Sequence, residues 1–276
     1  MVDFNQKIIC LITDFGLKGQ HYIASMKAVI LNINPSVRII DLSHHVNPHS
    51  IIEASYILKT TYKYFPEGTV FIIVVDPGVG SSREILVLKT VSNYHIIAPN
   101  NGIFSDFSTD QIAECREIRN DMFFKKPISN TFHGRDIMAP IGAHLLSGIP
   151  LKEFGPLFNL DKLIISKDLY NVDIQERIID CLIQYVDSFG NGITNIPIIN
   201  NKIQNYDLTI DEGMKINVNI KGELFEGLFT SYYENVPIGS ILVLVGSTGF
   251  LELSINQGNA SKKLGFNVGD IIKLKI

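Results

Sequence analysis

The sequence predicts an α/β domain with a mainly parallel sheet, followed by an all-β, barrel-like domain. Apolar runs of about five residues, typical of strands buried on both faces, alternate with helical patterns in the first part of the chain. Beyond that part, strand-like alternation punctuated by glycine replaces the helical patterns. We therefore expect one domain over residues 1–160 and a second over residues 161–276.

Three strand–helix alternations open the first domain. The expected strands are 8–12, 37–42, 71–75, 85–89, 94–98 and 114–119, and the expected helices are 20–31, 50–64 and 137–146. Ser50 stands at the N-cap position of the second helix, with Glu53 at capping-box spacing. Residues 157–169 have no clear pattern and are expected to link the domains. The second domain is expected to hold strands at 178–186, 215–220, 241–245, 251–255 and 270–274.

Composition excludes several classes of protein. A hydrophobic fraction of 46% and a charged fraction of 19% predict a compact core, and a net charge of −4 offers no basic field for nucleic acid. The three cysteines, Cys10, Cys115 and Cys181, form no CxxC motif and suggest a reducing compartment. The N-terminus lacks a signal-peptide pattern, and no apolar run reaches the roughly 18 residues that a membrane span needs. We therefore expect a cytoplasmic protein without a membrane segment.

The loop that follows the strand at 71–75 is the first candidate site. Asp76 stands at the carboxyl end of a buried strand, where ligands bind in open α/β sheets. Gly78 and Gly80 make the loop pliable, so that Arg83 can fold back toward the carboxylate. An acid and a base would then share one site. A capping aspartate and a surface arginine would give the same sequence.

Other candidates in the first domain are polar residues at element ends. Asp14, after the first strand, can accept two hydrogen bonds from ribose hydroxyls, or act as a cap. His44, His45 and His49 could bind a metal, but no Cys or acidic ligand at zinc-like spacing accompanies them, which favours capping or solvated histidines. His133, between Phe132 and a glycine before a helix, is a candidate functional residue or a helix cap.

The second domain has two polar stretches that could contact a ligand. Asp187 to Asn195 follows an apolar strand, although Gly190-Asn191-Gly192 within it could be only a hairpin turn. The stretch from Gly246 to Glu252 carries small polar residues that would let a ligand approach the backbone, or that form a barrel turn. The glycine pair Gly78 and Gly80 lacks the third glycine of a dinucleotide loop, so no phosphate site is expected there.

Taken together, these motifs occur in a family-specific order. They are Thr13-Asp14-Phe15-Gly16, Val75-Asp76-Pro77-Gly78-Val79-Gly80 with Arg83, Ala98-Pro99-Asn100-Asn101-Gly102, Thr131-Phe132-His133-Gly134-Arg135-Asp136, Asp187-Ser188-Phe189-Gly190-Asn191 and Gly249-Phe250-Leu251-Glu252. From about residue 8 to the C-terminus, the chain resembles the S-adenosylmethionine (SAM) hydroxide adenosyltransferases, or adenosine-forming SAM hydrolases, which are relatives of the SAM-dependent halogenases.

The resemblance implies both a fold and a set of site residues. It implies an α/β domain, a C-terminal β-barrel and a homotrimer with sites between subunits. The catalytic trio of the hydrolases falls on Asp76, Arg83 and His133. The aspartate and the short connection after Arg83 favour water over halide as the nucleophile. The substrate-binding residues that it implies are Asp14 at the ribose hydroxyls, Asp187 at the methionine amino group, and Asn191 with the stretch from Ser247 to Glu252 on the purine side.

The implied reaction is hydrolysis of SAM to adenosine and L-methionine, through attack of an activated water at the ribose C5′. The departing sulfur becomes a neutral thioether, so no metal or redox cofactor is expected. Two other readings stay open. A halogenase would make a 5′-halogenated nucleoside from halide, and a SAM- or adenosine-binding protein would form no product.

Overall fold

The computed structural model describes residues 7–166 and 170–276. The chain forms two compact units, which divide between residues 166 and 167. The expected link over residues 157–169 is described as far as Ser166. The N-terminal stretch, considered above for a signal peptide, lies outside the described residues up to residue 6. No helix of the described ranges is long and apolar enough to cross a membrane.

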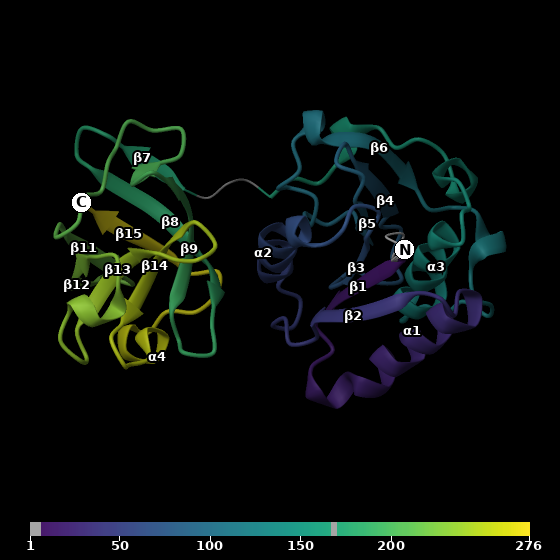
Figure 1. Cartoon of the computed structure of the whole chain (residues 1–276), viewed down its shortest axis with the longest axis horizontal. Coiled ribbons are helices and arrows are strands. Elements are labelled where there is room, and N and C mark those ends of the chain that lie inside the picture. Colours follow the sequence, from purple (N-terminus) through teal and green to yellow (C-terminus); the bar gives the residue numbers. More distant parts are fainter. Residues whose placement is uncertain (1–6, 167–169) are drawn as a thin grey trace, which may run out of the picture. The chain divides into compact units, whose positions relative to one another are not determined.

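The first unit is a six-stranded sheet with helices on both faces (Figure 1). Its elements are β1 (Ile8–Thr13), α1 (Gln20–Ile33), β2 (Arg38–Ser43), α2 (Ile51–Thr61), β3 (Val70–Val74), β4 (Ile85–Thr90), β5 (His95–Pro99), β6 (Ile112–Glu117), the π-helical turn η5 (Gly134–Met138) and α3 (Ala139–Leu146). The strand order is β2-β1-β3-β5-β4-β6, with the first four strands parallel and β4 antiparallel to both of its neighbours. The predicted mainly parallel sheet is confirmed.

The inner strands β1, β3 and β5 are apolar on both faces because helices cover both. In β3, Val70 and Ile72 belong to the core that contains residues of α1 and α3. Phe71 and Ile73 point the other way and join the core that contains residues of α2. Figure 1 shows α1 and α3 on one side of the sheet and α2 on the other. Successive side chains of a strand point to opposite faces of the sheet, and here both faces are covered by helices. Each position of the strand must therefore be apolar, which gives a continuous apolar run in the sequence.

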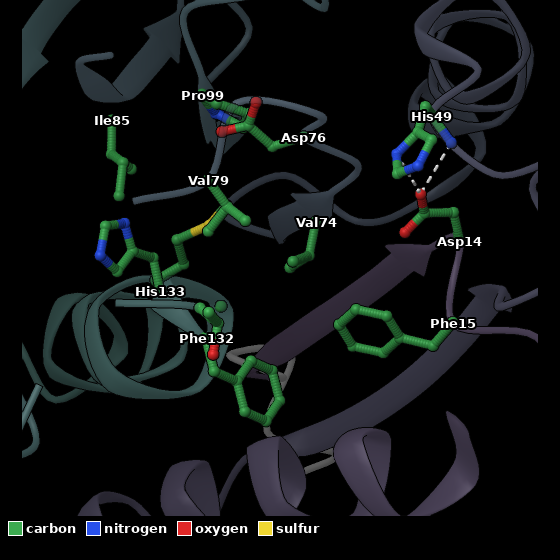
Figure 2. A pocket seen from close by; sticks show the side chains of 13 residues that line it. Asp14, Phe15, His49, Val74, Asp76, Val79, Ile85, Pro99, Phe132 and His133 are labelled. Carbon is green, nitrogen blue, oxygen red and sulfur yellow. Dashed lines mark hydrogen bonds and ion pairs between the residues drawn. The ribbon is translucent and has the colours of Figure 1, made fainter. Parts of the chain in front are cut away.

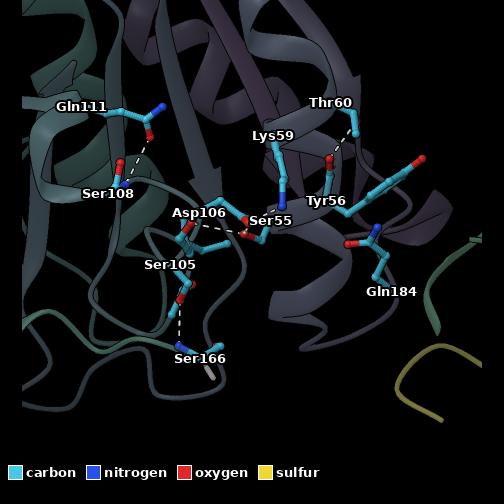
Figure 3. A network of polar contacts seen from close by, with 12 residues as sticks. Ser55, Tyr56, Lys59, Thr60, Ser105, Asp106, Ser108, Gln111, Ser166 and Gln184 are labelled. Atoms are coloured by element: carbon cyan, nitrogen blue, oxygen red, sulfur yellow. Dashed lines mark hydrogen bonds and ion pairs between the residues drawn. The ribbon is translucent and has the colours of Figure 1, made fainter. Parts of the chain in front are cut away.

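Polar contacts fix α2 at its start and along its length. Ser50 is the N-cap, as predicted, and its Oγ accepts a hydrogen bond from the Glu53 N–H at 3.4 Å. Further along, Lys59 Nζ donates to Asp106 Oδ1 at 2.6 Å, and Ser55 Oγ donates to Asp106 Oδ2 at 3.0 Å (Figure 3). These contacts hold the loop after β5 against the helix.

The second unit is a closed β-barrel. Its elements are β7 (Asn171–Asp173), β8 (Ile178–Val186), β9 (Gly192–Ile199), β10 (Lys202–Ile203), β11 (Lys215–Ile220), β12 (Glu223–Phe229), β13 (Ile241–Val245), β14 (Phe250–Ile255), α4 (Ala260–Leu264) and β15 (Ile271–Lys275). Strands pair in the order β9-β14-β13-β12-β11-β15-β8, and β8 pairs back to β9. The predicted barrel-like domain is therefore confirmed. Side chains such as Ile183, Val218 and Leu253 fill its core.

Candidate active site

Sheet topology brings the first-domain candidates to one edge. Asp14 directly follows β1, and Asp76 lies two residues beyond the end of β3. The parallel direction of these strands puts both aspartates at the carboxyl edge of the sheet. Because β4 is antiparallel to β5, it begins at this same edge, with Ile85 paired to Pro99. Arg83, just before β4, therefore returns to the edge where Asp76 lies.

The guanidinium of Arg83 folds back against the carboxylate of Asp76. Asp76 Oδ1 accepts a hydrogen bond from the Gly78 N–H at 2.8 Å, and Arg83 Nε lies 3.2 Å from the same oxygen. The Nε–H is not aligned for a hydrogen bond to that oxygen, and within the described ranges this buried nitrogen has no hydrogen-bond acceptor. A methyl group on residue 78 would lie 2.5 Å from Arg83 Nη2, so the guanidinium can take this position only over a glycine.

Two further glycines bring His133 close to this pair. His133 directly precedes the π-helical turn η5, and a Cβ on Gly134 would lie 2.8 Å from Val74 Cγ1 at the end of β3. A Cβ on Gly80, whose φ is +84°, would lie 2.2 Å from the backbone oxygen of Asn130. The Asp76 loop and the segment before His133 are therefore in direct backbone contact.

Asp14, Asp76 and His133 line one pocket of about 190 Å³ (Figure 2). The complete lining is Asp14, Phe15, His49, Val74, Asp76, Val79, Ile85, Pro99, Thr131, Phe132, His133, Gly134 and Met138. Arg83 is not part of this lining and reaches the pocket through Asp76. The pocket is smaller than the roughly 300–1,000 Å³ typical of ligand sites, so it could enclose only part of a nucleoside-sized molecule.

Asp14 is held by the backbone of His49. The His49 N–H donates to Asp14 Oδ2 at 2.9 Å, and its Nδ1 lies 3.8 Å from the same oxygen. His49 has a φ of 67°, a left-handed conformation that aims its N–H at the carboxylate. Figure 2 shows these two residues at one end of the pocket and His133 at the other.

The three clustered histidines do not converge on a common point. The buried His44 bonds through Nδ1 to Thr13 Oγ1 at 3.0 Å, and its Nε2 lies 2.9 Å from Asp41 Oδ1. His45 is exposed, whereas His49 lies beside Asp14. Over residues 7–166 and 170–276, no group of three or more His, Cys, Asp or Glu side chains could hold a metal ion. The exposed His45 and His49 fit the solvated interpretation, whereas the buried His44 is held by Thr13 and Asp41 and is neither solvated nor a helix cap.

Two of the second-domain candidates line a separate cavity of about 670 Å³ in the barrel unit. Its lining is Asp187, Phe189, Asn191, Tyr233, Ile255, Asn256, Gln257, Gly258 and Asn259. Asp187 Oδ1 accepts hydrogen bonds from the Phe189 and Asn191 N–H groups, both at 2.9 Å. The segment is also the turn between the antiparallel strands β8 and β9, so the hairpin interpretation is confirmed.

The other two second-domain candidates stand outside that lining. Ser247 is exposed in the turn between β13 and β14. Glu252 is buried and accepts hydrogen bonds from Tyr233 Oη and Ser254 Oγ, both at 2.7 Å. Burial and the neighbouring Glu252 carboxylate raise the pKa of Tyr233, so its phenol stays protonated. Glu252 therefore reaches the cavity through Tyr233.

Sequence reasoning missed several lining residues of this cavity. Tyr233 lies in a short 3₁₀ turn without any motif of its own. The run Asn256-Gln257-Gly258-Asn259 follows β14, and Gln257 has a φ of 52°. A polar, glycine-containing turn directly after an apolar strand was the signal that could have identified it.

The chain is a two-domain protein, with an α/β unit and a β-barrel unit. At the carboxyl edge of the α/β sheet, the Asp76–Arg83 pair and the His133 imidazole form a site typical of an enzyme. The family model of the SAM hydroxide adenosyltransferase N-terminal domain matches residues 9–155, and that of the C-terminal domain matches residues 181–273. The chain belongs to this SAM hydroxide adenosyltransferase family.

Individual relatives agree with this assignment over nearly the whole chain. An (R)-S-adenosyl-L-methionine hydrolase of Methanocaldococcus jannaschii is 35% identical, with 97% of this chain and 95% of the relative covered. One from Salinispora arenicola is 28% identical, covering 96% and 97%. A fluorinase of Nocardia brasiliensis is 24% identical, covering 98% and 97%. The crystal structure of an uncharacterized conserved protein from Thermotoga maritima is 38% identical, with a TM-score of 0.85, covering 98% and 100%.

Proposed function

We propose that this protein is an enzyme that hydrolyses S-adenosyl-L-methionine to adenosine and L-methionine. The proposal rests above all on one observation, that Asp76 and His133 face one pocket at the carboxyl edge of the sheet. It draws further support from the relatives named (R)-S-adenosyl-L-methionine hydrolase, which match nearly the whole chain with higher identity than the fluorinase does.

In the proposed reaction, a water oxygen forms a bond to the ribose C5′ while the C5′–S bond breaks. The sulfonium sulfur takes the bonding electron pair and leaves as a neutral thioether, so the leaving group needs no acid. One proton of the water is released. The main difficulty is the nucleophile, because bulk water has a pKa of about 15.7. Activation and positioning of this water must therefore supply most of the rate.

Each member of the trio has a distinct proposed role. Asp76 accepts the proton or a hydrogen bond from the water. His133 lines the same pocket and holds the developing hydroxide. Arg83 lies 3.2 Å from Asp76 Oδ1 and is not part of the pocket lining. Through this contact, its positive charge supports hydroxide character on the water.

The proposed substrate contacts come from both units. Asp14, with one oxygen held by His49, binds the ribose hydroxyls through the other. In the barrel unit, the family resemblance assigns Asp187 to the methionine amino group and Asn191 to the purine side; the two side chains line one cavity, where Asn191 Nδ2 donates to Asp187 Oδ2 at 3.0 Å. The stretch from Ser247 to Glu252 completes the purine side, with Glu252 acting through Tyr233.

We further propose a cytoplasmic homotrimer with sites at subunit interfaces, which needs SAM as substrate but no metal or other cofactor. Dialysis against a chelator should leave turnover unchanged. Sedimentation velocity should give three times the chain mass of 30.8 kDa. A loss of activity that added metal restores, or a stable monomer with full activity, would contradict these two parts of the proposal.

The decisive test is a chromatographic assay of the purified protein with SAM in ¹⁸O-labelled water. We expect adenosine that carries the label at its 5′-oxygen. A parallel incubation with chloride or fluoride should give no 5′-halogenated nucleoside. Tight SAM binding without any product after long incubation would refute hydrolysis and favour a binding protein.

Variants of the trio test the assigned roles. Asp76→Ala should lower turnover sharply and leave SAM binding largely intact. Arg83→Ala and His133→Ala should do the same, and combining them should cost much less than the product of the single effects, because the three act as one unit. Normal adenosine formation by Asp76→Ala would show that the carboxylate has no such role.

A further inference from the structure

We propose that Asn100 is a positioning residue, which fixes the Arg83 guanidinium toward Asp76 by anchoring the segment at residues 162–166 with its side chain and Arg83 with its main-chain carbonyl. This inference rests on the proposed role of Arg83 in hydrolysis. Asn100 does not line the pocket, although Pro99 directly before it does. Its action on the reaction would therefore be indirect.

The side chain of Asn100 bonds to the segment at residues 162–166, and its Nδ2 also donates to Glu84 Oε2 at 3.4 Å. Its Nδ2 donates to the Lys162 carbonyl at 3.1 Å, and its Oδ1 accepts the Ile164 N–H at 2.9 Å. Asn100 is only 2% exposed. The Asn100 amide thus donates to one peptide and accepts from a second peptide two residues further along the chain, as the backbone of a neighbouring strand would. No other residue type of this length supplies both a donor and an acceptor.

A second bond holds the same segment beside it. The Ser166 N–H donates to Ser105 Oγ at 2.7 Å (Figure 3), and Ser105 Oγ in turn donates to the Gly102 carbonyl at 2.6 Å. The loop after β5 thus carries two anchors, Asn100 and Ser105, for one stretch of chain. The orientation of the peptide at residue 100 is set by these anchors.

The main chain of Asn100 points the other way, to the arginine. Its N–H donates to the Glu84 carbonyl at 2.9 Å, and its carbonyl accepts from Arg83 Nη1 at 3.3 Å. Within the described ranges, this carbonyl is the one hydrogen-bond acceptor that the structure gives the guanidinium, since the approach of Nε to Asp76 is an ion pair without hydrogen-bond geometry. The position of carbonyl 100 therefore decides where the positive charge lies.

Removal of the Asn100 amide should release this carbonyl. The Lys162 carbonyl and the Ile164 N–H would lose buried partners, and the peptide at residue 100 would be free to rotate. Arg83 would then lose the acceptor that keeps it beside Asp76. Since displacement of a catalytic group by about 1 Å can cost on the order of 100-fold in rate, we expect a loss in kcat of tenfold or more with little change in KM.

A double-mutant cycle with kcat as the readout separates positioning from a structural effect. The variants are Asn100→Ala, Arg83→Ala and the double variant, compared with wild type in the adenosine assay. If Asn100 acts through Arg83, the double variant should turn over as fast as Arg83→Ala alone. Multiplied losses in the double variant would overturn the proposal. Added guanidinium ion should partly restore Arg83→Ala, and restore the double variant much less.

Asn34→Ala provides a matched control. Asn34 is also a buried asparagine, 6% exposed, with Oδ1 accepting the Ser36 N–H at 3.2 Å. It ends α1 just before β2 begins, at the opposite edge of the sheet from the pocket. This variant should lose stability without loss of kcat. If its kcat falls as far as that of Asn100→Ala, the effect of Asn100 is general and the proposal fails.

A crystal structure of Asn100→Asp decides the question independently of turnover, and also covers the case in which Asn100→Ala does not fold. Aspartate keeps the acceptor for Ile164 but lacks the donor for Lys162 and for Glu84 Oε2. We expect Arg83 Nη1 to leave carbonyl 100 and Nε to move beyond 3.2 Å from Asp76 Oδ1. An unmoved guanidinium would overturn the inference. Absence of adenosine formation by the wild type would instead refute the proposed function.

Discussion

Substitution of Gly78 by alanine should inactivate the protein without unfolding it. The added Cβ would lie 2.5 Å from Arg83 Nη2 and 2.9 Å from Nε, whereas ordinary contact begins near 3.4 Å. The φ of Gly78 is not in the left-handed region, so alanine meets no backbone strain there. The methyl group must therefore push aside the guanidinium, which is the far end of a flexible side chain.

The size of the effect follows from these distances. Relief of the clash requires a shift of the guanidinium by about 1 Å, which opens its 3.2 Å approach to Asp76. A displacement of that size is associated with losses on the order of 100-fold in rate, equivalent to about 2.7 kcal/mol of transition-state stabilisation. The free energy of unfolding should stay level or rise by about 0.4–1 kcal/mol, because alanine restricts the unfolded chain.

Adenosine formation and thermal unfolding, measured on the same preparation, test this prediction. Gly78→Ala should show the loss in kcat with an unchanged or slightly higher Tm. Ser82→Ala, an exposed change in the same loop, is the control and should match wild type in both measurements. Wild-type turnover by Gly78→Ala would show that the location of Arg83 does not matter for catalysis.

The remaining predictions concern stability. Burial, followed by the charge of Lys89, lowers the pKa of His95 to about 4, against about 6.5 in an unfolded chain. Only the unfolded state takes up this proton as pH falls from 6.5 to 4, so about 3 kcal/mol of stability should be lost across that window. Urea titrations at pH 7.5 and 4.5 should show a smaller loss of stability for His95→Gln than for wild type. An equal loss in both proteins would contradict this prediction. Phe71→Ala, at a fully buried position in β3, should cost about 3–5 kcal/mol by chemical denaturation, and a cost below 1 kcal/mol would disprove close packing there. Ser50→Ala, which removes the acceptor for the Glu53 N–H, should cost about 1 kcal/mol in the same assay, and no change would mean that the cap adds nothing.

The inner strands of the first unit were predictable because burial on both faces leaves a continuous apolar run. The run at β3 and the position of Asp76 at its end are examples. The path of the chain that brings Arg83 back to Asp76 was harder to predict from the sequence. Its return to Asp76 depends on β4 being antiparallel, and strand direction is set by pairing across the sheet rather than by local sequence.

In the barrel unit, four strands were missed: the short β7 and β10, and the longer β9 and β12. β9 contains Pro197, which argues against a strand, but this proline pairs with Phe250 beside a register irregularity between β9 and β14. β12 is mostly exposed along its first half, so its alternation is weak. The helix expected from residue 137 begins earlier, as the turn η5, because Gly134 packs closely against β3.

The role of Asn100 was also beyond reach of the sequence. Pro99-Asn100-Asn101-Gly102 indicates a turn, and nothing local shows that the amide of Asn100 would pair with a segment more than 60 residues later. Long-range partners of a buried amide are visible only once the chain is folded.

The closure of the barrel limits how this protein can associate wrongly. In the described part of the second unit, the sheet ends only at β7 and β10, which are three and two residues long. A neighbouring molecule would find little exposed backbone to extend, so fibril-like stacking through this unit is disfavoured. Association through strand edges is therefore left to the first unit, where β2, six residues long, lies at an edge of the sheet.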